Sequence, residues 1–322
     1  MRKAIIDILK NSEGKFISGE SMAGTLGISR TAIWKHIQKL REHGYKIFSR
    51  EKLGYKLDRM PDLLLPIEIQ NELDTKIIGR EMVYKHKVNS TNHVAKALAH
   101  AGAADGTIVV AEEQTGGKGL LDRNFYSPRS RGIWFSVILR PKFLTHDAPK
   151  CTLMAAVAVA EAMNRFNLKA EIKWPNDIMF DGRKLVGILT EVAGEIGKIN
   201  YIVVGIGINV NIDREEFPEN IRSVAASLSE MNGGFVSRID FFRAVLEEFD
   251  KLYLEANACG FGEILKLWQK YNITLGKNIR VISAGDGETF TGKAIDLDTD
   301  GALVVKTEDG LRTVYAGDVS IR

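Results

Sequence analysis

The sequence has few of the features that would place it in a membrane, an oxidising compartment or the zinc proteins. It contains two cysteines, Cys151 and Cys259, far apart and in apolar or small-residue surroundings. We expect free thiols in a reducing cytoplasm rather than a disulfide. No Cys/His cluster has the spacing of a zinc site. No apolar run approaches the ~18 residues of a membrane span, and residues 1–16 lack the continuous apolar core of a signal peptide.

Composition and length indicate a globular chain of more than one domain. Its 322 residues are 45% apolar and 26% charged, and their number favours two or three domains. The net charge of +3 hides an asymmetry, because residues 1–60 hold 13 Lys/Arg and 6 Asp/Glu. That segment therefore carries +7 and the rest of the chain −4. A basic module on a mildly acidic body predicts that the first part binds a polyanion.

The first 60 residues have the pattern of a winged helix-turn-helix. Apolar positions Ala4, Ile5, Ile8 and Leu9 predict a first helix over residues 2–11. Two further helices are expected, one capped by Ser18 and ending at Gly27, the other capped by Ser29 and ending at Gly44. In the third helix the apolar positions are Ile33, Ile37 and Leu40. Two short alternating strands follow, around a turn near residues 50–54, and complete the wing.

The third helix is the expected recognition helix, because its first turns place polar and aromatic side chains where they reach a major groove. The wing tip adds cations suited to phosphates. The DNA-binding candidates are Ser29, Arg30, Thr31, Trp34, Lys35, Arg50 and Lys52. A basic helix in a protein-interaction module is the alternative, and the combination of charge, capping and wing favours DNA.

Two further domains are expected after a proline-containing linker. In residues 67–271 strands and helices alternate, and short turns such as Asp181-Gly182 predict antiparallel pairing in an α+β domain. In residues 272–322 short strands separated by Asp-Gly turns predict a small β-barrel. The expected organisation is therefore a DNA-binding domain over 1–60, an α+β domain over 67–271 and a barrel over 272–322.

Several short motifs in the central domain have residue types suited to anion chemistry. In KWPND (173–177) a proline interrupts a strand-like run, so Lys173, Asn176 and Asp177 are expected to converge at a strand end or bulge. A lysine and a carboxylate there suit phosphate and metal, although a structural turn is the alternative. Lys184 enters an apolar strand, either serving an anion or lying exposed at the strand end.

Other motifs are ambiguous by themselves. GIGINVN (205–211) lacks the helix and third glycine of a dinucleotide fingerprint, and its glycines fit a strand that admits a close ligand. NSTN (89–92) offers Ser90 or Thr91 as the cap of a helix, whose free N–H groups also bind polar ligand edges. Trp134 lies in a core-like strand and is a candidate wall for an apolar ligand. GGKGLLDR (116–123) suggests an anion-wrapping loop, in which two leucines and an aspartate are unusual.

Taken in order over the full length, these motifs resemble those of the bifunctional biotin–protein ligase and biotin operon repressor family. The marks of the resemblance are NSTN, AEEQT (111–115), the loop 116–123, FYSP (125–128), KWPND, KLVGILTE (184–191) and GIGINVN. The resemblance implies an α+β protein with an N-terminal winged helix-turn-helix, a central biotin/lipoate-ligase-like mixed sheet with helices and a C-terminal SH3-like β-barrel.

The implied chemistry has two half-reactions and a regulatory role. Biotin and MgATP give biotinyl-5′-adenylate and pyrophosphate, and a lysine of the biotin carboxyl carrier protein then attacks the mixed anhydride. The adenylate also favours a homodimer that binds operator DNA as a cytoplasmic repressor. No membrane partner is implied.

The resemblance also implies roles for individual residues, with no covalent enzyme nucleophile required. Lys184, Arg123 and Asp177 are the implied catalytic residues, and positioning and charge stabilisation would supply most of the catalysis. Asp177 is also the implied Mg²⁺ ligand. The implied biotin-binding residues are Ser90, Thr91, Asn92, Gln114, Gly117, Lys118, Gly119, Leu120, Trp134, Lys184, Gly187 and Gly207. Those for ATP and the adenylate are Lys118, Arg123, Lys173, Asn176, Asp177 and Asn209.

The loop departs from the family pattern GRGRxGR. Lys118 keeps a charge without the fork of arginine, Leu120 replaces an arginine, and Asp122 stands where glycine is common. We therefore hypothesise that the protein forms the adenylate but releases it more readily than an arginine-bearing relative. Two alternatives are a regulator that senses biotin or its adenylate with weak ligase activity, and a ligase with a vestigial N-terminal domain. Retention of Lys184, Asp177 and Arg123 argues against the first, and the basic recognition-helix pattern against the second.

Overall fold

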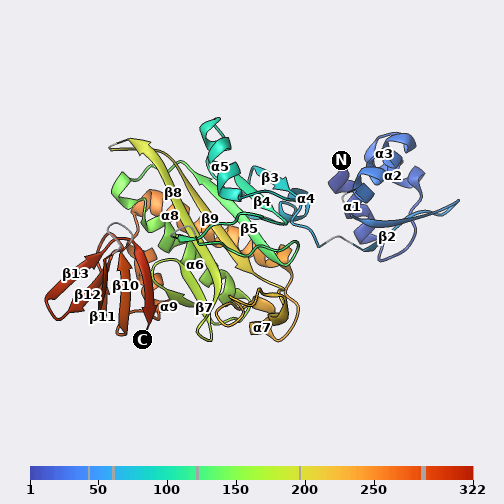
Figure 1. Cartoon of the computed structure of the whole chain (residues 1–322). Coiled ribbons are helices and arrows are strands. Elements are labelled where there is room, and N and C mark those ends of the chain that lie inside the picture. The colour runs from blue at the N-terminus through green and yellow to red at the C-terminus, as the bar shows by residue number, and fades with distance from the viewer. Residues whose placement is uncertain (43, 60–61, 121–122, 196, 284–287, 322) are drawn as a thin grey trace. The chain divides into compact units, whose positions relative to one another are not determined.

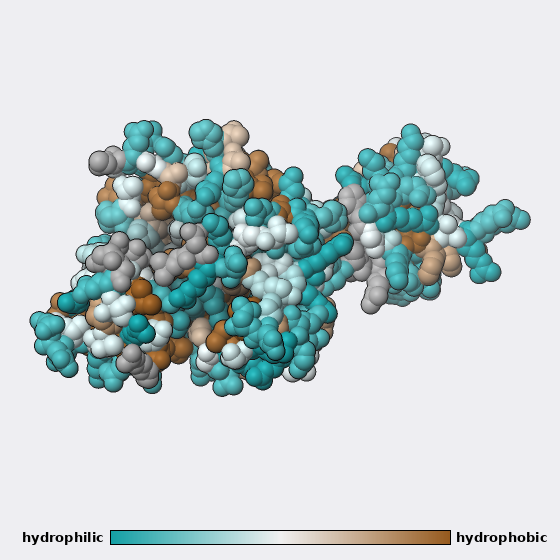
Figure 2. Space-filling model, in the orientation of Figure 1, coloured by the Kyte–Doolittle hydropathy of each residue, from teal (hydrophilic) through white to brown (hydrophobic). Residues whose placement is uncertain are grey.

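The computed structural model describes residues 1–321 except 43, 60–61, 121–122, 196 and 284–287. The chain divides into two units, Met1–Leu63 and Leu64–Arg322 (Figure 1). Hydrophilic residues cover most of the face of each unit that is visible in Figure 2, with smaller apolar areas between them. In the described part of the chain, none of the helices has the length and apolarity needed to cross a bilayer.

The N-terminal unit is the predicted three-helix module with a two-stranded wing. Its elements are α1 (Arg2–Asn11), α2 (Gly19–Leu26), α3 (Arg30–Glu42), β1 (Lys46–Arg50) and β2 (Gly54–Arg59). The predicted caps are confirmed: Ser18 Oγ accepts from the Ser21 N–H and Ser29 Oγ from the Ala32 N–H. The apolar stripe of α1 differs from the prediction, because Ile6 is buried with Ile5 and Leu9, whereas Ala4 and Ile8 are half-buried. The helix contacts both α2 and α3, which widens its buried face.

A mixed sheet forms the centre of the second unit. Its strands are β3 (Met82–Lys85), β4 (Ile108–Ala111), β5 (Gly132–Leu139), β6 (Glu171–Lys173), β7 (Asp177–Phe180), β8 (Arg183–Glu195) and β9 (Lys198–Asn209). Their spatial order is β3-β4-β5-β9-β8-β7-β6. All neighbouring pairs are antiparallel except β3 and β4. That pair is parallel because α5 (Thr91–His100) provides the crossover between them.

Helices cover both faces of this sheet (Figure 1). On one face α5 packs against β4, β5 and β9. The other face is covered by α6 (Lys150–Arg165), which also contacts α8 (Arg238–Cys259) and α9 (Gly262–Tyr271). This position between the sheet and two helices explains why α6 is apolar around most of its circumference. Among the described residues, the shorter helical elements include α4 (Pro66–Ile69), α7 (Leu228–Asn232) and the 3-10 turns Thr145–Asp147 and Arg214–Glu216.

The last part of the chain has the predicted short strands, and they form a five-stranded antiparallel sheet. Its strands are β10 (Asn278–Ser283), β11 (Thr289–Leu297), β12 (Leu303–Thr307), β13 (Gly310–Val314) and β14 (Gly317–Ile321). Their order is β13-β12-β11-β10-β14. Residues 311–321 form most of β13 and all of β14, which lie on opposite edges of this sheet. The buried side chains of the five-stranded sheet, including Ile279, Val281 and Leu303, join the apolar core of the central sheet.

The KWPND run is corrected from one strand into two. Residues 170–180 form β6 and β7, which pair antiparallel with Lys173 opposite Asp177. The peptide bond between Trp174 and Pro175 is cis and lies in the turn between the strands. The Trp174 indole N–H donates to the Gly301 carbonyl at 3.1 Å, which fixes this turn to the C-terminal sheet. The turn thus holds Asn176 and Asp177 at the edge of the site described next.

Candidate active site

The start of α5 and the strand extension after β4 form one polar cluster. Gln114 Oε1 accepts hydrogen bonds from the Thr91 N–H at 2.8 Å and the Thr91 hydroxyl at 3.0 Å. Gln114 Nε2 donates to Ser127 Oγ. Ser90 is the N-cap residue by backbone conformation, but its side chain makes no capping hydrogen bond. The predicted side-chain cap is therefore replaced by Gln114, which binds the first free N–H of the helix.

A second set of contacts fixes Asn92 beneath this cluster. Asn92 Oδ1 accepts from the Ser136 hydroxyl at 2.6 Å, and its Nδ2 donates to Glu191 at 2.8 Å. Glu191 also pairs with Lys96 at 2.7 Å. Gly205 faces Asn92 so closely that a Cβ there would lie 2.0 Å from Asn92 Oδ1. Glycine at this position therefore makes room for a buried amide.

A cavity with about 430 Å³ of empty space, part of it open to solvent, lies next to these residues. Of the biotin candidates, Ser90, Asn92, Gln114, Lys118, Gly119, Lys184, Gly187 and Gly207 line it. Gly187 and Gly207 pair across β8 and β9. A Cβ at Gly207 would lie 2.6 Å from Phe125 Cε1, so the ring rests on a floor without side chains. Phe125, Gly205 and the β8 residues Ile188 and Leu189 also line the cavity, and the motifs alone did not identify them as site residues.

The remaining biotin candidates lie elsewhere. Thr91 and Gly117 are buried behind the cavity wall, and a Cβ on Gly117 would lie 2.8 Å from the Phe125 carbonyl oxygen. Trp134 is 0% exposed, donates its indole N–H to the Pro128 carbonyl and packs edge-on against Phe125. The structure therefore places Trp134 in the core, where it supports Phe125 instead of lining either cavity. Leu120 lines the neighbouring cavities rather than this one.

Lys184 and the KWPND turn meet at the end of the first cavity. Lys184 Nζ lies 2.5 Å from Asp177 Oδ1, and Lys173 Nζ lies 3.4 Å from Asp177 Oδ2. Although Asp177 Oδ1 is buried and close to an ammonium group, it makes no hydrogen bond of acceptable geometry. Asn176 donates its amide N–H to the Ile188 carbonyl, which fixes the turn to β8. The predicted convergence of Lys173, Asn176 and Asp177 is present, with Lys184 added from β8.

A larger cavity of about 1310 Å³ shares Gly119, Phe125, Asn176 and Lys184 with the first. Arg123, Lys173, Asp177 and Asn209 line it, whereas Lys118 lines only the smaller one of the two. The sequence did not indicate the apolar end of this cavity, which is formed by Tyr126, Phe217, Ile221, Val224 and Ala225. It also did not indicate Asp318 of β14, which forms an ion pair with Arg123 at 2.7 Å.

The loop after Gly116 folds back over the junction of the cavities. The Gly119 N–H donates to the Arg123 carbonyl at 2.7 Å, and the Phe125 N–H donates to the Gly117 carbonyl at 2.8 Å. Leu120 thus lies at the far end of a narrow turn, half-buried beside the larger cavity. Asp122, the other departure from the family pattern, lies outside the described residues.

The DNA-binding candidates share one property, which is exposure. Trp34 is 51% exposed, in contrast to Ile33 and Ile37 of the same helix, which are buried. The full set, Ser29, Arg30, Thr31, Trp34, Lys35, Arg50 and Lys52, is exposed. The helix and wing therefore present these side chains to solvent, as DNA contact requires.

Comparison with known proteins identifies the class of each part. Residues 84–209 match the biotin/lipoate A/B protein ligase family, residues 274–322 match the biotin protein ligase C terminal domain, and residues 2–56 match an HTH domain. A structure of biotin protein ligase from Aquifex aeolicus in complex with biotin and ATP is similar, with a TM-score of 0.64 and 29% identity. It covers 76% of this chain and 99% of its own.

Full-length relatives add the N-terminal unit to that class. The chain is 38% identical to the bifunctional ligase/repressor BirA of Bacillus spizizenii, over 100% of this chain and 98% of that one. It is 31% identical to the bifunctional ligase/repressor BirA of Escherichia coli, over 99% and 96%. The chain therefore belongs to the family of bifunctional biotin ligase/repressors.

Proposed function

We propose that the protein activates biotin with ATP, transfers it to a lysine of a biotin carboxyl carrier protein and represses transcription when the adenylate is bound. The observation that supports the ligase activity most directly is the pair of connected cavities with Lys184 at their junction. The smaller one suits biotin, and the larger one, with an apolar end and several cations, suits a nucleotide.

In the first step the biotin carboxylate attacks the α-phosphorus of ATP and releases pyrophosphate. Both reactants are anionic, so a cation between them lowers their repulsion and stabilises charge that develops in the transition state. Lys184 lies where the two cavities meet, and Lys173 and Arg123 line the nucleotide side. In the second step the carrier amine attacks the carbonyl of the mixed anhydride, and AMP leaves.

The residues present also fit Mg²⁺. Asp177 lines the nucleotide cavity, and its buried Oδ1 has Lys184 Nζ as its neighbour at 2.5 Å but no hydrogen bond of acceptable geometry. Magnesium bound with a nucleotide commonly takes one or two carboxylates together with phosphate oxygens and water. Asp177 is the candidate ligand, and the ion would offset phosphate charge there.

Repression would use the exposed helix α3 and the wing in a homodimer on a two-part operator. We place both activities in the cytoplasm, where ATP and a carrier protein meet. The basic charge of residues 1–60 supports phosphate contacts.

Two assays test these proposals separately. Labelled biotin, ATP and an apo carrier domain are scored for transfer, with Lys184→Gln compared against Lys169→Gln, a change at a surface lysine paired with Glu171. We expect Lys184→Gln to lose about 10²–10³ in kcat, the scale for removing one charge-stabilising donor, and the control to keep its activity. No transfer by the unaltered protein at saturating substrate would leave only the sensing role. An operator gel shift with and without biotin and ATP tests repression.

A further inference from the structure

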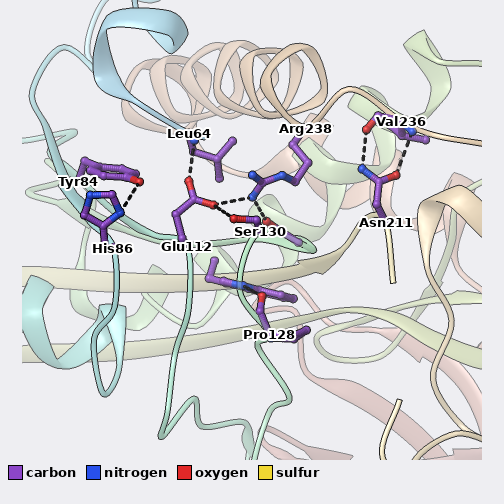
Figure 3. A network of polar contacts seen from close by, with 11 residues as sticks. Leu64, Tyr84, His86, Glu112, Pro128, Ser130, Asn211, Val236 and Arg238 are labelled. Atoms are coloured by element: carbon purple, nitrogen blue, oxygen red, sulfur yellow. Dashed lines mark hydrogen bonds and ion pairs between the residues drawn. The ribbon is translucent and has the colours of Figure 1, made fainter. Parts of the chain in front are cut away.

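The second unit holds its own first residue through a buried carboxylate. The Leu64 N–H donates to Glu112 Oε1 at 2.7 Å, and both residues are 0% exposed (Figure 3). Leu64 is also part of the apolar core that the central sheet forms. The chain that comes from the winged-helix unit is therefore fixed as soon as it enters the second unit.

The other oxygen of Glu112 is held from two sides. Glu112 Oε2 accepts from Arg238 Nη1 at 3.0 Å and from the Ser130 hydroxyl at 3.1 Å (Figure 3). Arg238 also donates to the Gly132 carbonyl at 2.9 Å. An ion pair that is 0% exposed at both ends is costly to desolvate and adds little net stability compared with apolar residues of similar volume. Its effect is better sought in the geometry that it imposes.

Helix α8 also binds the residues that follow Leu64, through side chains beyond Arg238. The Arg243 guanidinium donates to the carbonyls of Glu68 and Ile69 at the end of α4. Asp250 accepts the consecutive N–H groups of residues 76, 77 and 78, each at 2.8 Å. Arg243 and Asp250 thus bind residues 64–78 directly, and Arg238 acts on Leu64 through Glu112. This segment contains only one short helix.

This segment begins where the tether of the DNA-binding unit ends. Four residues, 60–63, separate β2 from Leu64, and a chain of that length extends over at most about 15 Å. A short tether limits the volume that the attached unit can sample, and the point where the tether begins determines where that volume lies. If residues 64–78 moved, the point at which the tether begins would move with them.

We propose that Glu112, Arg238, Arg243 and Asp250 form a tether anchor that positions the winged-helix unit for operator binding. These are positioning residues, and they touch neither substrate nor DNA. The inference rests on the proposed binding of two copies to a two-part operator. The anchor determines how strongly operator affinity depends on the distance between the half-sites. Each added base pair shifts and rotates one half-site relative to the other.

The test compares operators whose half-site spacing differs by one base pair, using the full-length protein with biotin and ATP. Arg243→Gln removes contacts to residues 68 and 69, and an insertion of six Gly/Ser residues between Asp62 and Leu63 lengthens the tether without touching the anchor. Lys251→Gln is the matched control, because this cation lies on α8 but is 73% exposed. Should Arg243→Gln fail to fold, Arg243→Lys replaces it, since lysine keeps the cation without the two-carbonyl contact.

We expect both altered proteins to discriminate between spacings at least threefold less than the unaltered protein, with unchanged kcat and KM for biotin. The insertion should also weaken binding to the best operator about fourfold, following the −3/2 power of tether length. Unchanged spacing selectivity in the Arg243 variant, or an equal loss of ligase activity, overturns the anchor. If the unaltered protein binds no operator, the proposed repressor function fails, and the anchor proposal with it.

Discussion

Replacing Gly205 by alanine should weaken biotin binding by a steric route that leaves the nucleotide cavity intact. The added Cβ would lie 2.0 Å from Asn92 Oδ1 and 2.8 Å from Asn92 Cγ, so the amide must move by more than an ångström. Asn92 would then lose its hydrogen bonds to Ser136 and Glu191, which are 2.6 and 2.8 Å long. Ser136 also bonds Thr91, the partner of Gln114.

The free-energy cost follows from these contacts. The neutral hydrogen bond contributes about 1 kcal/mol and the one to a carboxylate about 1.5–3 kcal/mol. Forcing a methyl group into a packed site costs about 1–3 kcal/mol. We expect a total of about 4–7 kcal/mol, shared between stability and biotin affinity. If about 1.4 kcal/mol of this cost is lost from the free energy of biotin binding, the KM for biotin rises tenfold.

Biotin-dependent pyrophosphate release, measured at saturating ATP, gives the KM for biotin, and denaturant unfolding gives the stability. Gly262→Ala is the control, since nothing lies within 4 Å of a Cβ there. The double variant Asn92→Ala/Gly205→Ala removes the clashing amide, so its unfolding penalty should be smaller than the sum of the two single penalties by at least about 1 kcal/mol. A folded Gly205→Ala protein with unchanged KM for biotin, or strictly additive penalties, would refute this reasoning.

Three further predictions concern other parts of the molecule. Glu112→Gln leaves Arg238 without its carboxylate and should lower the free energy of unfolding by about 3–5 kcal/mol, measured by denaturant titration; an effect below 1 kcal/mol would contradict the buried-pair argument. Leu120→Arg should slow dissociation of the adenylate, measured by trapping released labelled adenylate, and an unchanged off-rate would contradict the leaky-loop hypothesis. Lys35→Ala should reduce the slope of log affinity against log salt by about 0.9 on operator DNA if the lysine contacts a phosphate, whereas Lys3→Ala on α1 should leave that slope unchanged.

Local features of the fold follow from the sequence because their partners are neighbours in the chain. The Ser18 and Ser29 caps each bind an N–H three residues later, and Gly27 adopts the left-handed conformation that ends α2. The Asp181-Gly182 turn likewise has positive φ at both positions and joins antiparallel β7 and β8. Short-range chemistry determines each of these features.

Contacts between distant segments could not be predicted in the same way. Glu112 and Arg238 are 126 residues apart, and no periodicity in either segment indicates the other. Trp134 shows a related limit, because every residue of β5 is buried. Where both faces of a strand are covered, alternation does not tell which side chain faces a cavity and which one packs in the core. The sequence therefore predicted which segments surround the site better than it predicted which side chains line the cavities.

The charge distribution of the site supports the hypothesis that one guanidinium fewer weakens adenylate retention. Lys173 and Lys184 share Asp177, and Arg123 pairs with Asp318, so three cations face two carboxylates. These pairings leave a net charge of only +1 from the five groups in a cavity proposed to hold a triphosphate. An arginine in place of Leu120, which lines this cavity, would raise that to +2. The Arg123 side chain is 62% exposed, so its guanidinium is accessible to solvent and ions. The effect of Leu120→Arg on adenylate retention should therefore shrink as salt rises from 0.01 M to 1 M, where the screening length falls from about 30 to about 3 Å.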